Sequence, residues 1–263
     1  MVGLRYILSV KDLYMDYGQG NVLNGISFDV EPGQIVGYIG PNGAGKSTTI
    51  KIFLGIITNY TGKVEIFGED IRNKYLYKKR IGYVPEIIEL YESLTAMEYL
   101  NFVGQLYGLS ERQITKRAMK LIEMFDLQEA INSRLSTYSK GMRQKLAIVA
   151  SLIHNPDLLF FDEPLTGLDA NSATVFKELM KELKNEGKTI FYSSHIMEVV
   201  ERVSDRIILL NQGTIVADGP FEELAQKLKQ KNLEELFNQL TGFTNHQDIA
   251  KEIISIIKGE RDE

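Results

Sequence analysis

Short apolar runs bounded by turn residues fill the first part of the chain. Residues 6–10 and 25–30 form two such runs, and a glycine-containing turn at residues 17–20 separates them. Runs of this length between turns are typical of β-strands. Residues 34–39 follow a second turn and are mostly apolar, as expected of a strand buried on both faces. The chain therefore begins with a β-rich region that leads into a buried strand.

A glycine-rich loop follows this strand, and the pattern then predicts a helix over residues 46–56. Two further strands are expected at residues 63–67 and 81–84. Residues 96–155 carry apolar side chains at helical spacing and few strand signals. Because strand patterns return only after this stretch, we expect the helical middle to be an insertion.

Strands alternate with helices in the second half of the chain. Strands are predicted at residues 158–161, 189–192 and 206–210, with a helix over about 171–185 between the first two. Such alternation predicts a mostly parallel sheet covered by helices on both faces, so the fold class is α/β. Residues 221–263 are charged and helical in pattern, and we expect them to form a C-terminal helical extension.

Composition narrows the classes of function. The 263 residues are 44% hydrophobic and 25% charged, as in ordinary globular proteins, and the net charge of −5 weakens any role in gripping nucleic acid. The absence of cysteine excludes disulfides, thiolate catalysis and cysteine-built metal sites, and it fits a reducing compartment. The sequence has no run of about 18 apolar residues that could span a bilayer. Its first nine residues lack a signal-peptide pattern and are expected to belong to the first strand.

The loop after the buried strand has the pattern Gly, any four residues, Gly-Lys-Ser/Thr. A glycine-rich backbone lets several N–H groups converge on a phosphate, and the next helix points its positive end into the same space. We expect Lys46 to reach the β- and γ-phosphates and Ser47 to bind Mg²⁺. A chance glycine-rich turn is the alternative, but the flanking strand and helix supply the motif's required context. The predicted nucleotide-binding residues here are Gly40, Pro41, Asn42, Gly43, Ala44, Gly45, Lys46, Ser47 and Thr48.

Two acids end the apolar strand at residues 158–161. Asp162 is placed to hold the Mg²⁺ shell, directly or through water, because ligands bind at the carboxyl ends of strands in open α/β sheets. Glu163 can point the other way and polarise an attacking water. A solvated acidic turn is the alternative, and the phosphate loop makes it the weaker one.

These motifs resemble those of the ATP-binding cassette ATPases that power membrane transporters, over residues 4 to about 219. In that family an aromatic residue shortly upstream of the phosphate loop stacks on adenine, and Tyr17 matches this position. A surface tyrosine in a turn is the alternative interpretation of Tyr17.

Residues 138–142 stand where the family has its signature, Leu-Ser-Gly-Gly-Gln. Ser139 and Gly141 match the signature, whereas Lys140 and Met142 depart from it. Ser139 would cap the following helix, and the positive helix end would face the γ-phosphate held by another subunit. A plain helix cap is the alternative.

The resemblance implies roles for three further side chains. Asp169 ends the loop of residues 166–169, which crosses the dimer interface in the family and is assigned to the nucleotide site. His195 matches the switch histidine, which contacts the γ-phosphate and holds Glu163 and the water in line. Glu86 stands where the family usually has glutamine. An ionised glutamate can only accept hydrogen bonds, so Glu86 would bind Mg²⁺ without donating to water, or it would face a basic residue of a partner.

The family's architecture is a phosphate-loop NTPase with a RecA-like α/β core, an N-terminal antiparallel β subdomain and an inserted helical subdomain. Here the nucleotide-binding domain would span residues 1–220, with the helical subdomain at about 86–155 and the helical extension at 221–263. The resemblance implies an ATPase whose catalytic residues are Glu163, His195 and Lys46. ATP and Mg²⁺ are the expected ligands, with Ser47, Glu86 and Asp162 binding the metal.

The resemblance also implies how such a protein works with partners. Two copies, or one copy and a relative, would close head to tail around two Mg-ATP, each ATP lying between one phosphate loop and the other chain's Ser139. A separate membrane-spanning subunit would dock in a groove lined by residues 86–100, of which about half could instead be subdomain core. We therefore expect a peripheral protein on the cytoplasmic face of the membrane.

The versions of the motifs at residues 84–86 and 138–142, together with the tail at 232–242, most resemble exporter-type cassettes. One rival is a soluble cassette ATPase that acts on nucleic acid or ribosomes; the acidic charge and single cassette weigh against it, and no nucleic-acid partner is expected. A phosphate-loop kinase or GTPase would leave Ser139 and His195 without a role.

Overall fold

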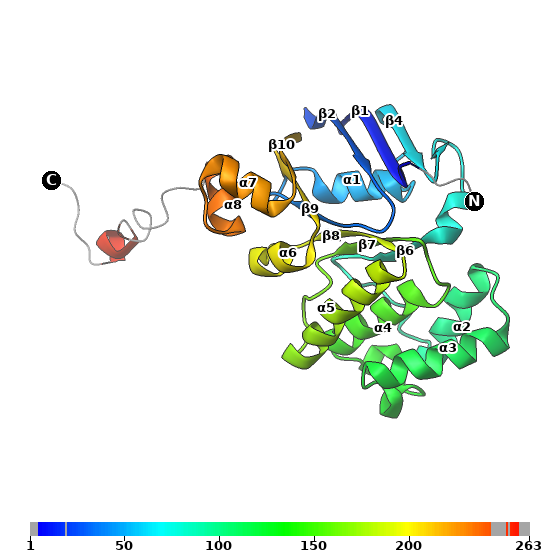
Figure 1. Cartoon of the computed structure of the whole chain (residues 1–263). Coiled ribbons are helices and arrows are strands. Elements are labelled where there is room, and N and C mark those ends of the chain that lie inside the picture. The colour runs from blue at the N-terminus through cyan, green and yellow to red at the C-terminus, as the bar shows by residue number, and fades with distance from the viewer. Residues whose placement is uncertain (1–4, 19, 243–250, 252, 258–263) are drawn as a thin grey trace.

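The computed structural model describes residues 5–18, 20–242, 251 and 253–257. In it, two β-sheets enclose helix α1 (Lys46–Phe53) (Figure 1). The N-terminal sheet has the strand order β2-β1-β4-β5, and its neighbouring strands are antiparallel. Its strands are β1 (Leu8–Asp16), β2 (Asn21–Val30), β4 (Thr61–Ile66) and β5 (Glu69–Asp70). The expected antiparallel β region is thus confirmed.

The second sheet has six strands in the order β10-β9-β3-β8-β7-β6. Four of its five pairings are parallel, and only the edge strand β10 runs antiparallel to its neighbour. Its strands are β3 (Ile35–Ile39), β6 (Ile81–Val84), β7 (Leu158–Asp162), β8 (Thr189–Ser193), β9 (Arg206–Asn211) and β10 (Thr214–Gly219). Every residue of β3, β7 and β8 is buried, as the continuous apolar runs predict.

Aromatic side chains fill the space between the sheets and hold α1 in place. The ring of Phe53 on α1 lies 5.8 Å from that of Phe160 and 5.9 Å from that of Phe191. Phe28 of the N-terminal sheet stacks on Phe191 at 6.2 Å. Because α1 is held by contacts of this kind on both sheets, the loop that precedes it has a defined position.

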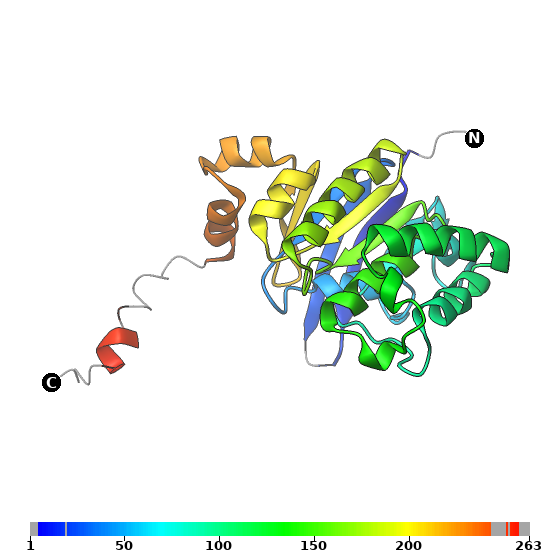
Figure 2. The same ribbon diagram turned by 90° about the horizontal axis from the view of Figure 1, so that it is seen from below.

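The helical middle lies between β6 and β7 in sequence. Helices α2 (Ala96–Leu106) and α3 (Glu111–Met124) each begin with a capping box, at Thr95 and Ser110 respectively. Helix α4 (Lys140–Leu152) joins them to the core, and it lies with α5 (Ala170–Asn185) on the face of the six-stranded sheet opposite α1 (Figures 1 and 2). Single 3₁₀ turns occur at η1 (Leu76–Arg80), η2 (Gln128–Ala130) and η3 (Leu135–Thr137).

The C-terminal part continues with α6 (Met197–Val203), α7 (Phe221–Leu228) and α8 (Leu233–Thr241). The amide of Leu233 donates to Glu201 (2.8 Å) and Asn211 donates to the carbonyl of Leu240 (3.3 Å), which ties α8 to α6 and β9. Residues 253–257 are helical. The parts of the expected extension at 243–250, 252 and 258–263 lie outside the described residues, as do residues 1–4 of the expected first strand.

Helix α1 and strand β10 are among the elements that differ from the sequence-based expectation. The helix expected over residues 46–56 ends at Phe53, because Gly55 takes a left-handed φ of 61° and turns the chain away. Strand β10, which follows a two-residue turn, was not predicted, because every second residue of this strand is exposed and its apolar pattern is weak. Within the described part of the chain, no helix is long and apolar enough to cross a bilayer.

Candidate active site

The glycine-rich loop joins the buried strand β3 to α1. A Cβ atom at Gly40 would lie 2.2 Å from the carbonyl oxygen of Leu210, so the backbone of β9 leaves room only for glycine there. Gly45 caps α1 with a φ of 106°, a conformation that other residues rarely adopt. The loop and the first turn of α1 thereby border the same space, an arrangement that suits a phosphate.

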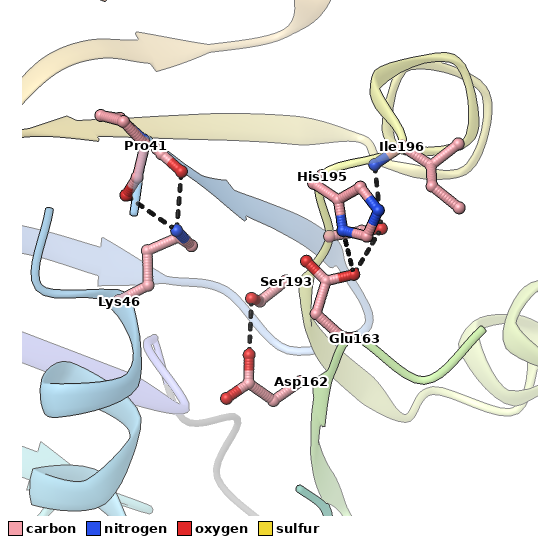
Figure 3. A network of polar contacts seen from close by, with 9 residues as sticks. Pro41, Lys46, Asp162, Glu163, Ser193, His195 and Ile196 are labelled. Carbon is pink, nitrogen blue, oxygen red and sulfur yellow. Dashed lines mark hydrogen bonds and ion pairs between the residues drawn. The ribbon is translucent and has the colours of Figure 1, made fainter. Parts of the chain in front are cut away.

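The side chain of Lys46 curls back over this loop (Figure 3). Its Nζ donates to the carbonyl oxygens of Gly40 (2.6 Å) and Pro41 (3.1 Å). Burial lowers the pKa of Lys46, and the charges of Asp162 and Glu163 act against that shift. The loop therefore presents a cation held among backbone dipoles, which suits an anionic ligand.

Asp162 is the last residue of β7 and is only 4% exposed. Ser193, at the end of the neighbouring strand β8, donates its hydroxyl to Oδ1 of Asp162 at 2.8 Å. Burial raises the pKa of Asp162, while the hydrogen bond from Ser193 lowers it. The carboxylate of Asp162 also interacts with the hydroxyl of Ser47 at the start of α1.

Glu163 points away from Asp162, as expected from the sequence. Its φ of 50° lies in the left-handed region, which is unfavourable for a glutamate and is typical of functional positions. The backbone N–H of Glu163 donates to the carbonyl of Ser193 at 2.9 Å. Its Oε2 accepts from the hydroxyl of Ser194 at 3.2 Å and lies 2.9 Å from Nδ1 of His195 (Figure 3). Ser193 and Ser194, at the end of β8, thus hydrogen-bond to the two acids, Ser193 to Asp162 and Ser194 to Glu163.

Two adjoining cavities surround these groups. The inner cavity has a volume of about 380 Å³ and the outer cavity about 590 Å³. The inner cavity is lined by Val22, Asn42, Gly43, Gly45, Lys46, Ser47, Thr48, Glu86, Asp162, Glu163 and Ser193. The outer cavity is lined by Gly40, Asn42, Lys46, Glu86, Ile87, Lys140, Glu163, Thr166, Ser194 and His195. The predicted phosphate loop, acid pair and histidine therefore come together at one place.

Oxygen ligands for a divalent cation meet in the inner cavity. Ser47, Glu86 and Asp162 all line it, and the charge of Glu86 contributes to raising the pKa of Asp162. The described residues contain no cluster of three or more His, Asp or Glu side chains that could hold a metal ion by themselves. This donor set fits Mg²⁺, which is commonly bound by one or two carboxylates and completes its shell with substrate phosphates and water.

Tyr17, Ser139 and Gly141 lie outside these two cavities, whereas Lys140 of the signature lines the outer one. The Tyr17 hydroxyl is 3.4 Å from Oγ1 of Thr48 in α1, and its side chain is exposed, so it stands beside the loop. Ser139 is exposed and caps α4, accepting from the amide of Met142 at 3.2 Å. Gly141 fits tightly, because a Cβ there would lie 2.6 Å from the carbonyl oxygen of Gly167.

The carboxylate of Asp169 is already engaged within its own chain. It caps α5 by accepting from the amide of Ser172 (2.9 Å) and from its hydroxyl (2.7 Å), and it pairs with Nζ of Lys145 (3.2 Å). These hydrogen bonds hold the pKa of Asp169 well below its usual range. Asp169 lines neither cavity and joins α5 to the signature helix α4.

Sequence reasoning missed three residues of the site. Ser193 and Ser194 hold the two acids, and their only signal was the polar run that ends β8 before His195. Lys140 was noted only as a departure from the signature, yet it lines the outer cavity with Lys46 and His195.

The chain is similar to several known proteins. Residues 23–166 match the family model described as "ABC transporter". The chain is 39% identical over 223 residues to the linearmycin resistance ATP-binding protein LnrL of Bacillus subtilis, covering 84% of this chain and 72% of the relative. It is 38% identical to the ATP-binding protein NatA of the same species, covering 81% and 87% of the two chains.

A solved structure shows the same fold. It is described as an ATP binding subunit of an ABC transporter, and it matches with a TM-score of 0.84 and 36% identity. The match covers 89% of this chain and 99% of the other.

Proposed function

This chain belongs to the ATP-binding cassette transporter family, as an ATP-binding subunit with ATPase activity, and we propose that two Mg-ATP-bound copies close head to tail and drive export through a separate membrane-spanning subunit. Relatives named for linearmycin resistance and for Nod factor export support the direction of transport. A pairing of this chain with a homologous subunit would satisfy the same geometry.

The position of Glu163 carries the chemical part of the proposal. Its carboxylate borders both cavities, and Ser194 and His195 hold it on the side away from Asp162. From there it can accept a proton from a water that attacks the γ-phosphate. His195 keeps the carboxylate in this direction and can contact the same phosphate.

The phosphate loop binds and orients the nucleotide. Its N–H groups and Lys46 would cradle the phosphates, while Ser47, Asp162 and Glu86 would hold Mg²⁺ against them. The bound Mg²⁺ would neutralise charge on the phosphate oxygens. Tyr17, which lies beside Thr48 with 57% of its surface exposed, would stack on the adenine.

The signature helix supports the head-to-tail arrangement. Ser139 is exposed at the N-terminus of α4 and lines neither cavity of its own chain. The positive end of α4 is therefore free to face a phosphate held by the other copy. Asp169 would act at this interface by bracing α4 through Lys145.

A groove beside the site fits a membrane partner. It has a volume of about 230 Å³ and lies between residues 83–90, α2 and α4. Ile87 and Tyr91, the sequence neighbours of the lining residues Ile88 and Leu90, are 75% and 61% exposed. Ile88, Leu90 and Met97 pack partly against the core. The expected docking stretch thus divides into exposed and core-packed residues. Binding there would place the chain on the cytoplasmic face of a membrane.

Reconstitution tests this function. The chain would be co-purified with a multi-span membrane protein encoded beside it and assembled in vesicles, with Glu163→Gln as the inactive control. We expect the membrane protein to stimulate ATPase activity and ATP to drive transport in the wild type alone. Failure of stimulation in a complex shown to form, or salt-sensitive binding to DNA or RNA, would contradict the proposal.

A further inference from the structure

A concentration of positive charge stands apart from the active site. Residues 71–80, which connect β5 to β6, contain five basic residues and no acid, although the whole chain carries −5. All five are exposed except Lys78, which is half-buried. The basic residues are Arg72, Lys74, Lys78, Lys79 and Arg80.

Large apolar side chains project from the same stretch. Tyr75 is 72% exposed and Leu76 is 78% exposed. The Nζ of Lys78 lies 5.3 Å from the Tyr75 ring centroid and 3.4 Å from the carbonyl oxygen of Gly55, whose neighbour Ile56 is 64% exposed. We call this set of residues the η1 surface: Ile56, Arg72, Lys74, Tyr75, Leu76, Lys78 and Lys79.

The buried side chain of Tyr77 anchors the η1 surface to the core. Tyr77 points inward, is buried, and packs with Ile71 in the core around α1. Its hydroxyl occupies the space that a Cβ of Gly55 would need, at 2.6 Å. Because Tyr77 faces the core, its neighbours Leu76 and Lys78 are directed outward without further ordering.

Internal ion pairs neutralise only part of this charge. Lys74 pairs with Glu69 at 3.0 Å and Arg80 pairs with Asp157 at 2.6 Å. Among the residues that the structure describes, Arg72, Lys78 and Lys79 have no ion-pair partner; Arg72 donates to backbone carbonyls, and its guanidinium stacks on Tyr60. Positive charge is therefore available to an external anion.

We propose that the η1 surface binds the anionic headgroup layer of a phospholipid membrane. Exposed aliphatic and aromatic side chains flanked by lysines are the combination that enters a membrane interface while its charges pair with lipid phosphates. Leu76 and Ile56 favour lipid over nucleic acid, since aliphatic side chains gain little from stacked bases but gain from leaving water for the acyl boundary.

The position of the surface agrees with this partner. The hydroxyl of Tyr107, which lines the proposed docking groove, donates to the carbonyl of Ile81 at 3.4 Å, directly after the end of η1. In Figure 1 this cyan segment lies on the side of the molecule where α2 and α3 are found. Lipid contact there would add to docking of a membrane subunit, but vesicle binding by the chain alone does not depend on that docking.

Co-sedimentation of the full chain with vesicles tests the proposal. The vesicles would contain phosphatidylcholine alone or phosphatidylcholine with phosphatidylglycerol. We expect binding only to the anionic vesicles and its loss at high salt. The double variant Lys78→Gln/Lys79→Gln should bind on the order of tenfold or more weakly, since each lysine near an anionic surface strengthens binding several-fold.

A matched pair provides the control. Lys116→Gln/Lys120→Gln removes two exposed lysines from α3 and should bind vesicles as the wild type does. Leu76→Ser should weaken binding without changing its dependence on salt, and Tyr75→Ser repeats this test. ATPase rates equal to the wild type show that each variant is folded.

Three results would overturn the proposal. They are no binding of the wild type to anionic vesicles, equal loss in the two lysine pairs, and full binding by Lys78→Gln/Lys79→Gln. If that double variant instead loses only its stimulation by a membrane subunit, the surface contacts protein, not lipid. None of these results touches the ATPase assignment.

Discussion

Oε2 of Glu163 lies 2.9 Å from Nδ1 of His195, although the glutamate side chain is 13% exposed and the histidine side chain 76%. The pair joins a shielded carboxylate to an exposed ring that lines the outer cavity. A donor at this position fixes the direction of the carboxylate, which a general base needs before it can receive a proton. The exposed ring is free to meet a phosphate as well.

Replacing Glu163 with glutamine tests this role. The amide keeps the shape of the side chain but cannot take a proton, so turnover should fall on the order of 100-fold or more while ATP binding persists. The trapped ATP-bound dimer should appear in size-exclusion chromatography. Glu123→Gln, in the exposed part of α3, is the control. Turnover within a few-fold of the wild type would remove Glu163 from the role.

Mixing two inactive chains tests the head-to-tail site. Lys46→Ala damages the phosphate loop and Ser139→Arg blocks the positive end of α4. If Ser139 acts on the other copy's nucleotide, a mixed dimer has one intact composite site, and activity should partly recover in a steady-state ATPase assay. Mixed dimers that are shown to form but stay inactive would argue for action within one chain.

Variants at Glu86 distinguish binding of Mg²⁺ by this side chain from a contact with the membrane partner. A charged carboxylate strengthens Mg²⁺ binding relative to a neutral amide, so Glu86→Gln should raise the Mg²⁺ concentration needed for half-maximal turnover. The maximal rate should stay within about tenfold. Glu86→Ala should weaken Mg²⁺ use further and also lower stimulation by the membrane subunit. Superimposed Mg²⁺ titrations of wild type and Glu86→Gln would leave only a contact with the partner.

The ionised carboxylate of Asp162 should lower the stability of the folded chain at neutral pH. Burial raises its pKa, so the folded chain holds this proton to higher pH than the unfolded chain does, and stability falls as the carboxyl ionises. Asp162→Asn should therefore raise the melting temperature at neutral pH while abolishing turnover. The amide oxygen can still accept from Ser193.

The higher stability of Asp162→Asn relative to the wild type should shrink as the pH is lowered through the raised pKa of Asp162. The protonated acid and the amide are then both neutral. Melting curves across this range check the sign. A gain that does not change with pH would trace the effect to packing, and lower stability of Asp162→Asn at neutral pH would contradict the prediction.

Contiguous motifs were the part of this protein that the sequence could predict. The phosphate loop, the acids after β7 and the α/β class each depend on neighbouring residues, whose local geometry follows from strand burial and glycine spacing. The family resemblance was confirmed for the same reason, since its motifs keep their order along the chain.

Tertiary structure decided the contacts between distant segments. Ser193 and Ser194 meet Asp162 and Glu163 only because β7 and β8 are adjacent parallel strands in register. Lys140 enters the outer cavity because Gly141 lets α4 approach Gly167.

The exposed residues of η1 form a surface because Tyr77 anchors the segment in a core built from both sheets. A residue's own type and its near neighbours determine backbone preference and chemistry. Which side chains meet across the sheet depends instead on the packing of the whole chain, which no local pattern contains.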